Sequence, residues 1–160
     1  MRGATLASLP LQPPLPVIDD AASGATIITL DVSSFPSLSN GGCSIRSYNI
    51  QRDDGFGGSF VSMIGSVSPY MMTRYTAIGL LRSRTYRFRY RVRNCIGWGP
   101  FSDEVTELAA TKPSAPPQPM LKAVSATALE LNLFPTRDNG GSAVTTYDLY
   151  RNLGTDGSAF

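Results

Sequence analysis

The sequence lacks histidine entirely and contains only two cysteines in 160 residues. Histidine is the most frequent general base in enzymes, and protein zinc sites are built mainly from cysteine and histidine. The usual catalytic and zinc-binding arrangements therefore cannot be assembled from this chain. We predict no catalytic residue, no metal site and no cofactor, and we do not expect an enzyme.

Charged residues are also scarce, at 16% of the chain with a net charge of +2. Nucleic-acid binding requires a concentrated basic surface, so this balance does not predict it. No run of about 18 apolar residues is present, so no membrane span is predicted in this segment. Residues 1–10 lack the apolar centre of a secretion signal, and such a signal is expected upstream if the protein is exported.

The chain does have enough apolar residues to fold and many residues that form turns. Apolar residues make up 42% of it, which is typical of globular rather than disordered chains. It contains 15 glycines and 12 prolines, many serines and threonines, and no long run of good helix formers. This composition favours a turn-rich, all-β protein.

An internal repeat is present, with an offset of about 100 residues. The matching segments share residue types and spacing, and they pair Pro10–Pro16 with Pro113–Pro119, Ala25–Val32 with Ala126–Leu133, Asn40–Gly42 with Asn139–Gly141, and Tyr48–Arg52 with Tyr147–Arg151. The second copy has no counterpart of residues 62–109. Half a module would leave apolar faces and strand edges uncovered, so we infer a fragment of a longer chain.

The repeat also sets the predicted domain boundaries. Because the second proline-rich linker follows a finished module, residues 1–12 are expected to be a linker or the tail of a preceding module. The alternative is that Met1 is a native start. Residues 13–112 are expected to form a complete module, and residues 113–160 the N-terminal part of a second, truncated one.

Seven short strands are predicted in the complete copy, where alternating segments lie between turn signals. They span residues 15–19, 25–33, 44–52, 58–65, 73–79, 85–94 and 102–108. The sixth is the clearest, because apolar side chains alternate with arginines and one face must be buried. We expect two facing sheets to enclose Ile28, Leu30, Tyr48, Ile50, Tyr86, Phe88 and Tyr90.

The sixth predicted strand and the loop after it resemble those of fibronectin type III domains. The residues that carry the resemblance are Tyr86, Phe88, Tyr90, Val92, Asn94, Gly97, Gly99 and Ser102, of which Tyr90 and Val92 are larger than the family pattern. Residues 40–52 and 139–151 are both similar to the family's third strand, and Leu80 ahead of Tyr86 is similar to its tyrosine corner. The resemblance implies an all-β, immunoglobulin-like, seven-stranded β-sandwich, followed by the first strands of a second module.

Cys43 opens the third predicted strand and Cys95 closes the sixth. The resemblance makes these strands antiparallel neighbours in one sheet. A disulfide is geometrically allowed if the two Cα atoms lie within about 7 Å of each other. Such a bond would indicate an oxidising compartment, and the alternative is two free thiols.

Four arginines alternate along the outward face of the sixth predicted strand, namely Arg87, Arg89, Arg91 and Arg93. Such a stripe is suited to acidic glycans, acidic lipid surfaces or an acidic protein neighbour. The alternative is a solvated strand face, partly neutralised by acidic residues of the next strand. Arg91 and Arg93 are also expected to stack on Trp98 or Phe101, as arginine does over aromatic rings.

The resemblance implies a non-catalytic structural or adhesive spacer in a tandem array, with other modules of the array or neighbouring chains as partners. Stiff proline-rich linkers fit this role, since they favour an extended path of about 3 Å per residue. The alternatives are a ligand-binding receptor ectodomain, a filament-forming subunit completed by neighbouring chains, and an accessory module of a larger enzyme. The expected location is extracellular or at the cell surface, and the alternative is an intracellular cytoskeletal filament.

Overall fold

The computed structural model describes residues 6–32 and 35–151, and the chain divides into two units, Met1–Thr111 and Lys112–Phe160. The first unit contains seven strands in its described residues: β1 (Val17–Ile18), β2 (Ile28–Asp31), β3 (Ser47–Arg52), β4 (Val61–Ile64), β5 (Arg74–Ala77), β6 (Thr85–Arg93) and β7 (Val105–Leu108). Each lies within one of the seven predicted ranges. Two short 3-10 turns, η1 (Asp20–Ala22) and η2 (Ser37–Ser39), interrupt the loops.

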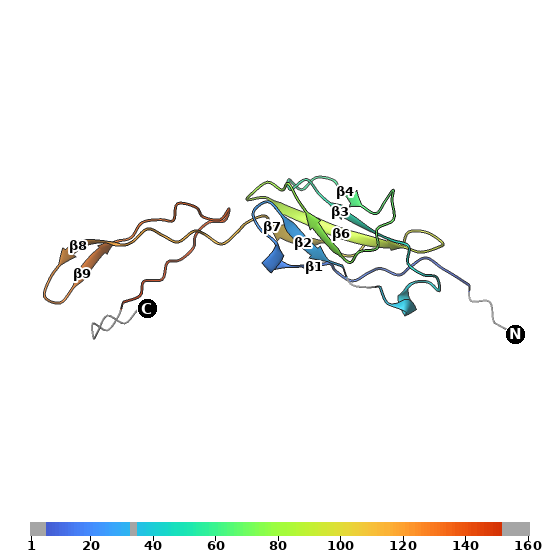
Figure 1. The fold of residues 1–160 in the computed structure, drawn as a ribbon, viewed down its shortest axis with the longest axis horizontal. Coiled ribbons are helices and arrows are strands. Elements are labelled where there is room, and N and C mark those ends of the chain that lie inside the picture. The colour runs from blue at the N-terminus through green and yellow to red at the C-terminus, as the bar shows by residue number, and fades with distance from the viewer. Residues whose placement is uncertain (1–5, 33–34, 152–160) are drawn as a thin grey trace. The chain divides into compact units, whose positions relative to one another are not determined.

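The strands of the first unit form two antiparallel sheets. One has the order β1-β2-β5 and the other has the order β4-β3-β6-β7 (Figure 1). This is the all-β, immunoglobulin-like sandwich that the sequence predicted. In the larger sheet β6 is central, since it pairs with β3 on one side and β7 on the other.

Apolar side chains from both sheets form the core of the first unit. The seven residues expected there are all at most 5% exposed, and Val32, Ala77, Leu80, Val92 and Ala109 join them. Along β6 buried and outward positions alternate, which puts the aromatic residues inside and the arginines outside. The predicted alternation of this strand is therefore confirmed.

Residues 6–11 belong to the first unit and run beside its Asn-Gly-Gly turn. The amide of Ser8 donates to the carbonyl oxygen of Gly41 at 2.8 Å, and the amide of Leu11 donates to that of Ser39 at 3.0 Å. Gly41 has a φ of 70°, and a Cβ atom there would lie 2.3 Å from the Ser8 oxygen. This position therefore requires glycine both for its backbone conformation and for the close approach of the chain.

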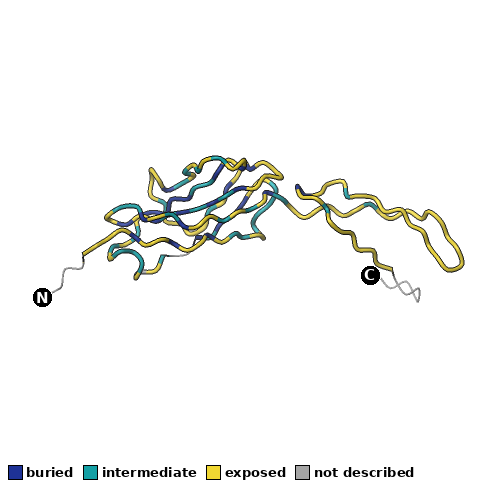
Figure 2. The backbone as a smooth tube through the Cα atoms, turned by 180° about the vertical axis from the view of Figure 1, so that it is seen from behind, coloured by how far each residue is buried: buried dark blue, intermediate teal, exposed yellow. Residues whose placement is uncertain are grey.

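The second unit contains a two-stranded antiparallel hairpin in its described residues, β8 (Met120–Val124) and β9 (Leu129–Asn132). By the repeat these strands correspond to β1 and β2. Figure 2 shows that most of residues 112–151 are exposed, in contrast to the first unit.

The prediction of a further strand within residues 139–151 was wrong, because no strand is present there. In the first unit the corresponding strand, β3, is held between β4 and β6. The described part of the second unit offers no such neighbours, so this segment has no sheet to join.

Candidate functional site

The outward face of β6 carries alternating arginine and aromatic groups, which we call the arginine-aromatic ladder. Its members are Arg87, Arg89, Arg91 and Arg93 from β6 and the rings of Phe60, Phe101 and Trp98 from neighbouring loops. The guanidinium carbons lie over the rings at 5.0 Å (Arg87–Phe60), 4.0 Å (Arg89–Phe60), 4.1 Å (Arg89–Phe101), 4.5 Å (Arg91–Phe101), 4.8 Å (Arg91–Trp98) and 5.8 Å (Arg93–Trp98).

The strand geometry explains this stacking. Alternate side chains of a strand are about 7 Å apart, and van der Waals contact requires about 3.5 Å on each side of a ring. One ring therefore fits between two successive guanidinium groups. Each arginine also gains the attraction between a cation and the electron-rich face of a ring.

Polar side chains of β3 accept hydrogen bonds from two of these arginines. Arg89 donates from Nε to Oε1 of Gln51 at 3.0 Å, and Arg91 donates from Nε to Oδ1 of Asn49 at 3.3 Å. Asn49 is itself held, since its Nδ2 donates to Ser62 Oγ at 2.6 Å and to the Ile64 carbonyl at 2.8 Å. These hydrogen bonds restrict the conformations of the two arginine side chains and so orient their guanidinium groups.

Arg87 differs from the other arginines of the ladder because it is paired with carboxylates. Its Nε lies 2.9 Å from Oδ2 of the buried Asp53, and its Nη1 lies 3.4 Å from Oε2 of Glu104. The hydrogen bond to Asp53 raises the pKa of Arg87. By contrast, burial lowers the pKa of Arg91, and the positive charge of Arg89 adds to this effect. Negative charge is thus concentrated at one end of the ladder.

The structure brings together all six residues that the sequence proposed as a binding surface, which are Arg87, Arg89, Arg91, Arg93, Trp98 and Phe101. Sequence reasoning missed Phe60, Asn49 and Gln51, which complete the ladder from other parts of the fold. The signal for the last two was their alternation with the apolar Tyr48 and Ile50, which places Asn49 and Gln51 on the outward face of β3. The structure adds the register, in which they lie opposite Arg91 and Arg89.

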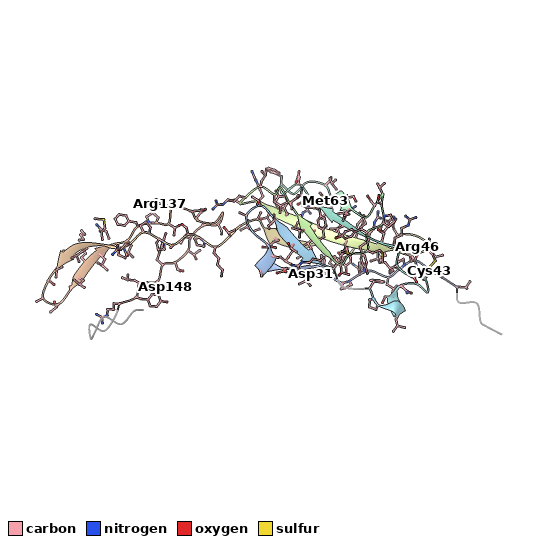
Figure 3. All side chains as sticks on the ribbon, in the orientation of Figure 1. Asp31, Cys43, Arg46, Met63, Arg137 and Asp148 are labelled. Carbon is pink, nitrogen blue, oxygen red and sulfur yellow. A yellow bond between two sulfur atoms is a disulfide. The ribbon has the colours of Figure 1, made fainter. Side chains whose placement is uncertain are left out.

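Cys43 and Cys95 are joined in a disulfide with their Cα atoms 6.0 Å apart. The bond links the loop after η2 to the loop after β6, at the end of the first unit where Figure 3 labels Cys43 and Arg46. Asn94 reinforces the same end, because its Nδ2 donates to the carbonyl oxygens of Ser8 (2.6 Å) and Asn40 (2.8 Å). A covalent bond and a side-chain amide thus hold three loops together.

The tyrosine at the start of β6 makes the corner contact that the resemblance implied. The amide of Leu81 donates to the Tyr86 hydroxyl at 2.8 Å, while the side chain of Leu80 is buried in the core. The backbone partner is therefore one residue after Leu80. The contact fixes the turn that leads into the strand carrying the ladder.

Across residues 6–32 and 35–151, no group of three or more acidic, cysteine or histidine side chains is suitably placed for a metal ion. Within the same residues, no helix has the length and apolarity needed to cross a membrane.

Comparison with known proteins identifies the fold. No family model matches the chain. The sixth fibronectin type III domain of human fibronectin type III domain containing protein 3 matches with a TM-score of 0.53 and 25% identity, over 71% of this chain and 99% of that one. Domains from titin match with a TM-score of 0.53 and 22% identity, over 64% of this chain and 33% of theirs.

A similar match is found in the twitchin kinase region from C. elegans, with a TM-score of 0.53 and 22% identity over 64% of this chain. This chain spans only 17% of that structure and about a third of the titin one. The matches therefore show the fold, which is that of a fibronectin type III domain.

Proposed function

We propose that this chain, built on the fibronectin type III fold, serves as a non-catalytic spacer in a tandem array and makes protein contacts through its exposed sheet faces. The proposal rests on one observation. In each copy, a backbone hydrogen bond joins the proline-rich segment to the region of the Asn-Gly-Gly turn of the same copy. In the first unit the bond runs from Leu11 to Ser39, and in the second the amide of Ser114 donates to the Asp138 carbonyl at 2.9 Å. An anchored entry segment is what a spacer of defined length needs.

The connection between the two units is short. Ala109, just after β7, is buried and exchanges backbone hydrogen bonds with Ser83 and Arg84. The next anchored position is Ser114, so only residues 110–113 lie between the two. Pro113 is one of them, and proline removes backbone freedom at its own position. A short, proline-containing connection restricts the motion of successive modules.

The disulfide supports an extracellular or cell-surface location for the array. Structural disulfides persist in oxidising compartments and are rare in the cytosol, where thiols are kept reduced. Alkylation of the native protein without reductant, followed by mass measurement, tests this location. Labelling of both Cys43 and Cys95 would favour the alternative of an intracellular filament.

The spacer role can be tested by measuring the distance between the two units in the full chain. Nitroxide labels carried by non-natural amino acids at the exposed positions Ser59 and Thr127 leave the cysteines untouched. Electron-electron double resonance should give one narrow distance distribution, because the connection is short and restrained. A variant with Gly-Ser-Gly-Ser inserted after Thr111 provides the flexible control. A native distribution as broad as that of this variant would refute the spacer proposal.

A further inference from the structure

Arg89, Arg91 and Arg93 of the arginine-aromatic ladder form a row of positive charges that is suited to a negatively charged ligand. Among the described residues, Arg87 is the only arginine of the ladder that forms ion pairs, with Asp53 and Glu104. Arg89, Arg91 and Arg93 have no carboxylate partner there. Their charges accumulate side by side, about 7 Å apart along one strand. We propose that they bind an extended acidic peptide segment with aspartate or glutamate at alternate positions.

The free edges of the guanidinium groups are suited to carboxylates. In the described part of the chain, the side chains of Arg89 and Arg91 make hydrogen bonds only from Nε. Their Nη atoms remain for an external acceptor, and a guanidinium fork matches the two oxygens of a carboxylate. Arg87 shows the same chemistry within the chain, since it already binds the carboxylates of Asp53 and Glu104.

The spacing favours a peptide in an extended conformation. Alternate side chains of an extended peptide are about 7 Å apart, which is also the separation of successive arginines on β6. Three carboxylates on one side of such a peptide therefore meet three guanidinium groups in register. Adjacent acids would point to opposite sides of the peptide, and only part of them would reach the ladder.

The aromatic rings of the ladder argue against a ligand that binds by stacking. Single-stranded nucleic acids use open aromatic faces as platforms for their bases. Here Phe101 lies 4.1 and 4.5 Å from the guanidinium carbons of Arg89 and Arg91, and Trp98 lies 4.8 and 5.8 Å from those of Arg91 and Arg93, so arginines already occupy ring faces that a base would need. The rings separate the guanidinium groups from one another, and the ligand would be bound by the Nη atoms at the edges of these groups.

Titration of the full chain with two synthetic peptides tests the proposal, with the arginine Nε–Hε signals observed by NMR. One peptide is acetylated Glu-Thr-Glu-Thr-Glu and the other is acetylated Glu-Glu-Glu-Thr-Thr, which has the same composition and charge. We expect the alternating peptide to bind more tightly and to shift the signals of Arg89, Arg91 and Arg93. Arg91→Gln should weaken its binding about tenfold, as expected when a charged hydrogen bond is lost. Arg137→Gln removes the same charge from an exposed position of the second unit and should leave the affinity unchanged.

Arg93→Gln provides a second variant should Arg91→Gln disturb the fold. Arg93 is exposed, and among the described residues its guanidinium group lies over the ring of Trp98 only. This variant should also weaken the alternating peptide while the amide spectrum of the core stays unchanged. Equal affinity for the two peptides, or unshifted arginine signals, would overturn the proposal. So would tighter binding of a heparin-derived hexasaccharide in the same titration, because the ladder would then be a site for sulfated glycans. None of these outcomes depends on the distance measurement that tests the spacer role.

Discussion

The two units share a sequence pattern at their first strands but differ in what they bury. Ile28 and Leu30 of β2 are 0% exposed, whereas Leu129 and Leu131 of β9, their counterparts, are 68% and 37% exposed. β2 pairs with β1 and β5 and lies against a second sheet, while β9 pairs only with β8 among the residues that the structure describes. The alternation of apolar and polar residues thus determines which face of a strand can enter a core. Whether that face is buried depends on other strands, which come from distant parts of the sequence.

The turns behave differently from the strands, because they are nearly the same in both units. Gly41 and Gly140 have φ values of 70° and 74°, and Asn40 and Asn139 each accept a hydrogen bond from the second glycine of the turn, at 2.9 and 3.0 Å. These contacts involve residues two apart, so they form without a finished sandwich. The conformation of the turns is thus fixed by neighbouring residues, whereas burial of the strands needs the whole module.

The largest expected difference between the units comes from the disulfide. Ser142 stands in the second copy where the first has Cys43. A cross-link across a sequence separation of 52 residues stabilises a domain by about 4 kcal/mol through the entropy of the unfolded chain. Replacing Cys43 and Cys95 by serine should lower the free energy of unfolding of the first unit by this amount in guanidinium denaturation. Ser142→Ala is the matched control, and an unchanged midpoint in the double serine variant would contradict the prediction.

The second prediction tests the difference in burial directly. Leu30→Ala should cost about 3 kcal/mol, because a buried leucine is lost and a cavity remains. Leu131→Ala changes the same residue type at the matching position of β9, where the side chain is partly exposed already. It should cost less than about 1 kcal/mol of the local stability of its hairpin. Denaturation followed by circular dichroism measures the first effect and amide exchange the second. Similar costs would show that the two strands are equally well packed.

The third prediction concerns the feature that the units share. Gly41→Ala should cost about 1–2 kcal/mol for the left-handed backbone, and the added Cβ would also displace the Ser8 carbonyl. Amide exchange at Ser8 and Leu11 should accelerate as residues 6–11 detach. Gly140→Ala should have the corresponding effect on the amide of Ser114, which is bonded next to the matching turn. Slow exchange in both variants would mean that the turns do not hold the proline-rich segments.

The features that the sequence predicts are, in the same way, those that depend on neighbouring residues. All seven strands of the first unit and seven of the twelve apolar residues buried in its described part were predicted, because alternation and turn residues are local signals. The strands are nevertheless shorter than predicted; β2, for example, covers Ile28–Asp31 within the predicted range 25–33. All four residues of β2 pair with β5, from Ile28 opposite Ala77 to Asp31 opposite Arg74, so the length of the strand follows from its neighbour rather than from the alternation of its own residues. The contribution of Phe60 to the ladder could not be predicted, since it depends on how the segment before β4 folds over β3 and β6.

The smallest predicted effect is a pH dependence of the stability of the first unit. Arg74 is hydrogen-bonded to Asp19 and lowers the pKa of that carboxyl below its ordinary value of 3.8. Because the folded-state pKa is depressed, the ion pair stabilises the unit above about pH 3.8, and this contribution is lost as the pH falls through the lowered value. Asp19→Asn should therefore be slightly less stable than the native chain at pH 7 and equal to it near pH 2 in urea denaturation.

The matched position in the second unit is Lys122, which pairs with Glu130 instead. Lys122→Gln should leave the pH dependence of the first unit unchanged. A constant difference between Asp19→Asn and the native chain at all pH values would show that the carboxyl does not titrate as expected.

The placement of Trp98 gives the ladder a built-in reporter. It is the only tryptophan of the chain, and its ring lies 4.8 Å from the guanidinium carbon of Arg91 and 5.8 Å from that of Arg93. Indole fluorescence from this protein is therefore a property of the first unit alone, and it responds to positive charge on the ring face. Any change that draws these cations away from the ring alters the emission without the addition of a dye.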